Sequence, residues 1–285
     1  MKKLLETHRN ADAHWVGDGF PVRSIFSHQR PTPRVSPFLL LDYAGPAQFA
    51  PSSRPRGVGE HPHRGFETVT IVYQGEVEHR DSAGNEGRIG PGDVQWMTAG
   101  SGVLHEEMHS REFTHRGGAL EMIQLWVNLP ARHKMSRPRY QSLLARDIPT
   151  LPLADGQGEL RVIAGEFRGV AGPALTFTPI DLWDLRLPAG ARARLPLRDG
   201  RTTALFVREG VARASDSQRI GAAELAVYER AGQDVELVAD EDLSALVLAG
   251  EPIDEPVVGY GPFVMNTEHE IEQAIRDFEA GRLGD

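Results

Sequence analysis

The chain has 285 residues, a formal net charge of −9 and no cysteine. This length allows two domains of ordinary size, or one large β domain, and a sizeable core in either case. The acidic balance argues against direct nucleic-acid binding, which relies on Lys and Arg surfaces, and the lack of cysteine excludes thiolate ligands and disulfides.

The N-terminal residues Met1–Leu5 resemble the start of a signal peptide. Glu6, Arg9 and Asp12 then interrupt the stretch that such a peptide needs to be apolar. No apolar run approaches the length of a membrane-spanning helix. We therefore expect a cytoplasmic protein without membrane contact.

Glycine and proline punctuate many short runs of β-branched and aromatic residues along the chain, which predicts an all-β fold. Turns are expected where Gly, Asn and Asp cluster, as at residues 81–85 and 198–200. The clearest predicted strands are Glu67–Tyr73, Leu120–Val127, Leu160–Ile163, Asp181–Leu187, Ala204–Val207 and Leu243–Leu248.

Two pairs of metal-ligand residue types stand two positions apart: His61 with His63, and His105 with Glu107. Strand side chains on one face recur every second residue, so each pair presents two ligand atoms to the same side of a sheet. Facing each other across a barrel, the pairs form a site of imidazole and carboxylate. Such a site suits a divalent first-row transition metal rather than calcium or magnesium.

Two further histidines are interpreted as unrelated to the site. His79 lies in the charged stretch Glu76–Asp81 and is expected to be solvated, and His109 is expected in a loop beyond the barrel rim.

The proline-rich segment 137–156, which ends in Asp155-Gly156, is expected to link an N-terminal domain, 1–136, to a C-terminal domain, 157–285. Ten of the eleven histidines precede residue 140, so the metal site is assigned to the first domain. A helix is predicted at about 267–280, with Asn266 or Thr267 as its cap. Its apolar stripe comprises Ile271, Ile275 and Phe278.

Several motifs resemble the cupin superfamily and, within it, the pirin family. The stretch His61–Gly75 matches the first cupin motif, and the run from Pro91 to His105 matches the second. Within the first, HPHRGFETVT at 61–70 is also specific to pirins. More specific to pirins are the stretches at 95–100, 124–130, 37–42 and 259–267. The match extends from about residue 19 to the C-terminus.

The resemblance implies a bicupin, in which two antiparallel β-barrel, jelly-roll-like domains are followed by a short C-terminal helix. The implied ligands are His61, His63, His105 and Glu107, commonly around Fe²⁺, although Ni, Co, Mn, Cu or Zn also suit this set. Glu67 has ligand parity and is the ligand in many other cupins, so it remains an alternative to Glu107. Gln124, Trp96 and Glu67 are the candidates for residues that support the site or line its pocket.

The resemblance also implies a dioxygenase that cleaves a flavonol such as quercetin, or a related phenolic, with O₂. Glu107 is then both ligand and proton acceptor. The alternative is a regulator without enzymatic activity that binds a protein partner according to the oxidation state of its metal, with the basic cluster Arg132–Arg139 as one surface for that partner. A scaffold protein with a vestigial metal site is the third interpretation.

Overall fold

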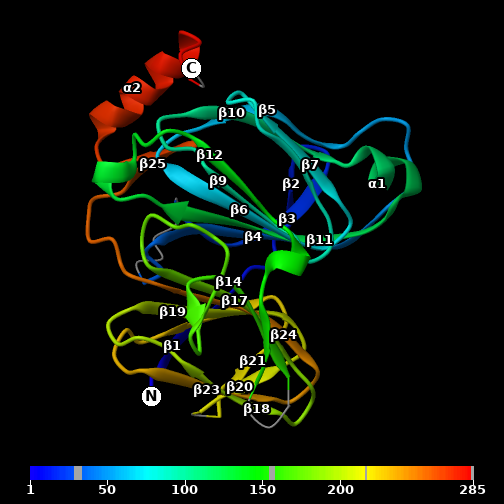
Figure 1. Ribbon diagram of the computed structural model, residues 1–285, viewed down its shortest axis with the longest axis vertical. Coiled ribbons are helices and arrows are strands. Elements are labelled where there is room, and N and C mark those ends of the chain that lie inside the picture. The colour runs from blue at the N-terminus through cyan, green and yellow to red at the C-terminus, as the bar shows by residue number, and fades with distance from the viewer. Residues whose placement is uncertain (29–33, 154–157, 216, 284–285) are drawn as a thin grey trace. The chain divides into compact units, whose positions relative to one another are not determined.

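The computed structural model describes residues 1–28, 34–153, 158–215 and 217–283 (Figure 1). Strands dominate, and the chain divides into two compact units. Each unit contains one seven-stranded and one four-stranded antiparallel sheet, as the cupin fold predicts. The all-β bicupin prediction is therefore confirmed, with each barrel formed from two sheets.

The unit that carries the histidine pairs comprises the described residues of Asp12–Pro31, Phe38–Ala145 and Ile253–Asp285. Its large sheet has the order β12-β9-β6-β11-β4-β3-β2, with bounds Arg139–Leu143, Val94–Thr98, Phe66–Gln74, Gly118–Asn128, Phe38–Phe49, Phe20–Ser27 and His14–Val16. Its small sheet has the order β5-β10-β7-β8, with bounds Gly57–His63, Val103–His109, Val77–Asp81 and Glu86–Ile89. A hairpin of β25 (Val258–Tyr260) and β26 (Phe263–Met265) completes its strands.

The other unit comprises the described residues of Met1–Ala11, Thr32–Pro37 and Arg146–Pro252. Its large sheet has the order β1-β22-β19-β24-β17-β14-β13, with bounds Leu4–Arg9, Glu224–Tyr228, Thr202–Glu209, Leu243–Gly250, Ile180–Leu187, Glu159–Ala164 and Thr150–Pro152. Its small sheet has the order β18-β23-β20-β21, with bounds Arg192–Pro196, Asp234–Ala239, Ala212–Ala214 and Arg219–Ile220. The short pair β15 (Glu166–Phe167) and β16 (Val170–Ala171) stands apart.

Each end of the chain belongs to the unit opposite to the one expected from the domain bounds 1–136 and 157–285, with the linker 137–156 between them. The N-terminal strand β1 pairs with β22 of the C-terminal unit, whereas β25, β26 and the final helix belong with the N-terminal strands. Strand β19 pairs with one edge of β22, and β1 pairs with the other. Without β1, the backbone N–H and C=O groups at that second edge would have no strand partner. The expected Asp155-Gly156 turn lies outside the described residues.

The two interiors differ in chemistry. In the C-terminal unit a single cluster of mainly Leu, Val and Ala side chains fills the space, for example Val162, Leu205 and Val247. In the other unit, apolar side chains such as Val72 and Leu120 form a separate cluster of their own. Buried polar side chains occupy further positions of this second interior, and these carry the candidate site.

The end of β5 is held in place by buried contacts. Arg64 follows His63 directly; its Nη1 lies 2.8 Å from Asp277 Oδ2 and its Nε donates to Ser101 O at 2.6 Å. Gly65 has φ +89°, and a Cβ there would overlap the carbonyl oxygen of Val264. The strand that carries two candidate ligands is therefore anchored immediately after the second of them.

Lys134 supports the same turn from inside the protein. It is 1% exposed, and its Nζ donates to Gly65 O, Val264 O and Asn128 Oδ1 at 2.8–2.9 Å. Burial lowers the pKa of Lys134 to about 8. The basic cluster Arg132–Arg139 is therefore not a continuous exposed surface.

The structure contains the predicted C-terminal helix as α2, Glu268–Glu279, whose N-cap Thr267 accepts a hydrogen bond from the Glu270 N–H. Ile271 is buried as expected, but Phe278 is 42% exposed. A short helix, α1 (Arg111–Arg116), was not predicted and is capped by Ser110. No helix among the described residues is long and apolar enough to cross a membrane.

Candidate metal centre

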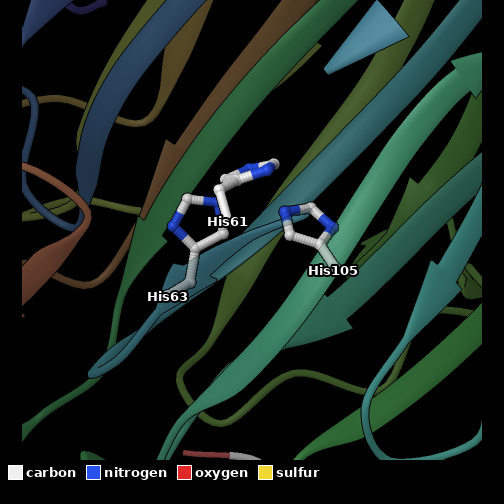
Figure 2. A group of neighbouring side chains, drawn as sticks. All are labelled: His61, His63 and His105. Carbon is white, nitrogen blue, oxygen red and sulfur yellow. The ribbon is translucent and has the colours of Figure 1, made fainter. Parts of the chain in front are cut away.

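Strands β5 and β10 bring three histidines together. They pair antiparallel, with His105 opposite His61 and Val103 opposite His63. One candidate ligand atom from each of His61, His63 and His105 lies within 4.8 Å of the others. Figure 2 shows the three rings converging on one point between the strands. Three of the four predicted ligands, His61, His63 and His105, thus meet between the two strands.

The ring nitrogens are available to a metal. His61 Nδ1 lies 2.9 Å from Gly59 O and donates to it, which leaves Nε2 with its lone pair. Among the described residues, His63 Nδ1 and His105 Nε2 are buried without a hydrogen-bond partner. Buried nitrogens of this kind are costly unless they bind something, so the site fits a metal ion.

The electrostatics favour the ligand form of these rings. Burial, and next the neighbouring imidazoles, hold the pKa of His63 and that of His105 well below the ordinary histidine value. Both rings are therefore neutral at pH 7, and neutral imidazole is the form that binds metals.

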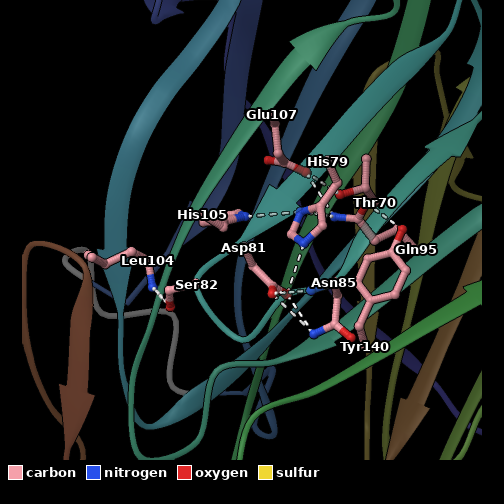
Figure 3. Close-up of polar contacts among 10 residues, drawn as sticks. All are labelled: Thr70, His79, Asp81, Ser82, Asn85, Gln95, Leu104, His105, Glu107 and Tyr140. Atoms are coloured by element: carbon pink, nitrogen blue, oxygen red, sulfur yellow. Dashed lines mark hydrogen bonds and ion pairs between the residues drawn. The ribbon is translucent and has the colours of Figure 1, made fainter. Parts of the chain in front are cut away.

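Glu107 lies beside the histidines but is not part of their group. It is buried on β10, on the same face as His105. Its Oε1 lies 3.0 Å from Thr70 Oγ1 and 3.2 Å from Gln95 Nε2, and its Oε2 lies 3.4 Å from Gln124 Nε2. Side chains of the large sheet thus hold the Glu107 carboxyl group by both oxygens; Figure 3 shows the Thr70 and Gln95 side chains beside Oε1.

Aromatic side chains adjoin His63. The Trp126 ring lies 5.2 Å from the His63 ring, measured between centroids, and stacks on Phe66 at 4.2 Å. Trp126 is only partly buried and also stacks on His28, with a centroid distance of 5.6 Å. The site therefore has an aromatic side next to one ligand.

Two family models match most of the chain. The model described as Pirin matches residues 19–127, which include all four predicted ligands, and the model described as Pirin C-terminal cupin domain matches residues 182–284. The chain belongs to the pirin family. The predicted membership in the cupin superfamily is confirmed with it.

Relatives match over the full length. A Pseudomonas aeruginosa protein named "Putative quercetin 2,3-dioxygenase PA2418" is 59% identical over 99% of each chain. A tomato (Solanum lycopersicum) "Pirin-like protein" is 40% identical over 100% of this chain and 92% of its own length. A crystal structure of "Quercetin 2,3-dioxygenase from Acinetobacter baumannii" is 52% identical, covers 100% of this chain and 99% of its own, and superposes with a TM-score of 0.97.

Within this pirin-family site, the three residues predicted to support it lie on different faces. Gln124 contacts Glu107 as expected. Glu67 stands three positions from Thr70 on β6, and Trp96 follows Gln95 on β9, so both point to the opposite face of the large sheet. Glu67 instead accepts a hydrogen bond from Thr98 Oγ1 at 2.7 Å. This placement removes Glu67 from contact with the histidines.

Glu67 carries a pH-dependent stability of its own. Burial raises its pKa to about 7 from a model-compound value of 4.5, although the Thr98 hydroxyl opposes the change. Between these two pH values the folded protein keeps a proton that the unfolded chain has lost. The stabilisation is therefore complete below pH 4.5 and is lost as the pH rises through 7.

We expect Glu67→Gln, which keeps an acceptor for Thr98, to be more stable than the wild type by about 2–3 kcal/mol at pH 8 and little changed at pH 4.5. Denaturant unfolding at the two pH values measures this. The exposed Glu86→Gln is the control and should show no such pH-dependent difference. A Glu67→Gln effect that is equal at both pH values would contradict the assignment.

Proposed function

We propose that the protein is an iron-dependent dioxygenase that cleaves a flavonol such as quercetin, or a related phenolic, with O₂. The observation that carries this proposal is the convergence of three neutral imidazoles beside a buried carboxyl group and an aromatic side. The full-length similarity to proteins named as quercetin 2,3-dioxygenases supports the same reaction class.

On this proposal His61, His63 and His105 hold the metal, and Glu107 completes the ligand set. Three imidazoles and one carboxylate leave open positions on a five- or six-coordinate ion, as a catalytic site requires. When bound, the metal supplies Lewis-acid and redox chemistry for the reaction between a phenolate and O₂.

Glu107 is also the proposed proton acceptor for the substrate hydroxyl. Its Oε1 accepts from Gln95 at 3.2 Å and lies 3.0 Å from the Thr70 hydroxyl, whose one proton is shared with Gln124 Oε1 at 2.6 Å. Its Oε2 faces Gln124 Nε2 alone, at 3.4 Å. Oε2 is therefore the less engaged oxygen and the one assigned to receive the proton. The Thr70 and Gln95 contacts keep the carboxyl group oriented during the transfer.

Trp126 is assigned to orient the aromatic substrate. Its ring is stacked on Phe66, so its position is fixed from one side, and it remains partly exposed next to His63. A flat phenolic ring stacks favourably against such a side chain. On this proposal, a substrate stacked there directs its hydroxyl toward the imidazoles, because Trp126 lies next to His63.

The test is anaerobic loading of the purified chain with Fe²⁺, followed by exposure to quercetin and O₂. We expect one O₂ consumed and one CO released for each quercetin lost, and no turnover by the metal-free protein. Stoichiometric metal binding without turnover, repeated for Ni, Co, Mn and Cu, would sink the dioxygenase proposal. The alternative of a metal-responsive regulator would then be tested by partner binding to ferrous and ferric protein.

A further inference from the structure

A second polar cluster lies behind His105, and Gln95 is the one member of it that the proposed reaction uses. It consists of His79 and Asp81 on β7, together with Asn85, Tyr140 and Gln95 (Figure 3). His79 is 3% exposed, and the expectation that it is solvated was wrong because β7 turns residues 77, 79 and 81 inward. Buried polar groups of this kind are kept in defined hydrogen-bonding states by their partners.

Asp81 determines which groups of the cluster donate hydrogen bonds and which accept them. The Asn85 backbone N–H and Nδ2 donate to Asp81 Oδ1 at 2.9 and 3.1 Å. Asp81 Oδ2 lies 3.2 Å from His79 Nε2. A carboxylate is an acceptor, so His79 carries its proton on Nε2 and presents the lone pair of Nδ1.

That lone pair faces the metal ligand. His79 Nδ1 lies 3.4 Å from His105 Nδ1 and 3.3 Å from Gln95 Nε2. Two imidazole nitrogens can share a hydrogen only if one donates, so His105 carries its proton on Nδ1. Its Nε2, the buried nitrogen without a partner among the described residues, then keeps the lone pair that a metal needs.

We propose that Asp81 and His79 are positioning residues that fix His105 in the Nδ1–H tautomer and so aim its Nε2 lone pair at the metal. This inference rests on the metal site of the proposed function. A metal-binding histidine ordinarily donates its other ring N–H to a single carboxylate, carbonyl or water. Here the acceptor is a second histidine, His79, which is itself oriented by the Asp81 carboxylate.

The surroundings hold His79 in the required plane. The Tyr140 ring stacks on it at 4.8 Å with an interplanar angle of 19°. Tyr140 in turn lies over Gly87, where a Cβ would collide with its hydroxyl oxygen. Gln95 donates to both His79 Nδ1 and Glu107 Oε1, so one amide group links the His105 support to the second candidate ligand.

Asp81→Asn tests the inference without a change of size. Asn85 Nδ2 lies within hydrogen-bond distance of both Asp81 oxygens, but the Asn85 backbone N–H donates to Oδ1 alone. This N–H attracts the new amide oxygen, so the amide NH₂ faces His79 Nε2. His79 must then carry its proton on Nδ1 and donate toward His105, which shifts His105 to the Nε2–H tautomer. His79→Phe is the second variant, because it keeps a ring against Tyr140 and removes the acceptor.

Two measurements read the result. Long-range ¹H–¹⁵N NMR of the metal-free chain reports the His105 tautomer, which we expect to be Nδ1–H in the wild type and Nε2–H in Asp81→Asn. Competition between the protein and a chelator reports Co²⁺ affinity, which we expect to fall about 10- to 100-fold in both variants. Glu106→Gln, an outward neighbour on β10, is the control for simple loss of negative charge and should bind Co²⁺ within about twofold of the wild type.

An Nε2–H tautomer of His105 in the wild type would overturn the proposal, as would an unchanged Co²⁺ affinity in folded Asp81→Asn and His79→Phe. A purely structural role predicts lower unfolding temperatures with unchanged affinity. The tautomer is read without metal and the affinity without substrate. Failure of the dioxygenase assay and failure of this inference are therefore distinguishable.

Discussion

His63→Ala is expected to abolish quercetin turnover and to weaken Co²⁺ or Fe²⁺ binding by about 1,000-fold. Removal of a direct ligand must cost more than the 10- to 100-fold typical of groups that only support a ligand. His63 is more buried than His61, and the centroid of its ring lies 4.8 Å from the ring centroids of both His61 and His105. Its loss leaves two imidazoles that converge on the metal position.

Chelator competition and O₂ uptake measure the two effects in the same preparation. His115→Ala, which removes an exposed histidine on α1, is the matched control and should leave both unchanged. A His63→Ala protein that retains stoichiometric metal and wild-type kcat would contradict both the ligand assignment and the proposed reaction.

The histidine pairs could be predicted because β10 follows one simple rule. Residues 103, 105, 107 and 109 are buried while 104, 106 and 108 are less so. The spacing of His105 and Glu107 follows this period of two, although apolar Leu104 and Met108 stand on the less buried face. The same rule applies to β7, where His79 and Asp81 are also two positions apart. The charged residues on either side of His79, Glu78 and Arg80, indicated a solvated strand, but it is these two that face outward.

The period of two could not predict which face of the sheet carries Glu67. Nearly every residue of β6 is buried, so the strand has no alternation that distinguishes the face of Thr70 from the face of Glu67. Only the pairing of β6 with β9 and β11 decides which side chains meet Glu107. The supporting residues of the site therefore depend on sheet packing that a single sequence does not encode in its periodicity.

The domain exchange has a similar cause. β1 is a six-residue edge strand, and nothing in its composition specifies whether it joins β22 or a strand nearer in the sequence. Pairing at a free edge is set by which backbone groups lack partners in the folded unit. The predominance of strands and the C-terminal helix could be predicted from the sequence, whereas the short helix α1 and the assignment of the chain ends could not.

Glu107→Gln is expected to lower turnover by about 10²- to 10⁴-fold, a barrier increase of about 3–5 kcal/mol, while the protein still binds metal. The amide cannot take up the substrate proton, and its NH₂ placed at Oε2 would face the Gln124 donor 3.4 Å away.

Glu106→Gln again serves as the control, because it makes the same chemical change on the outward face of β10. Steady-state O₂ uptake separates kcat from KM, and chelator competition gives the Co²⁺ affinity. A fall in kcat with unchanged affinity assigns Glu107 as a proton acceptor alone, and a fall in both assigns it as ligand and acceptor. A kcat within threefold of the wild type would exclude Glu107 from the proton transfer, and an unchanged Co²⁺ affinity as well would leave the three histidines as the whole ligand set.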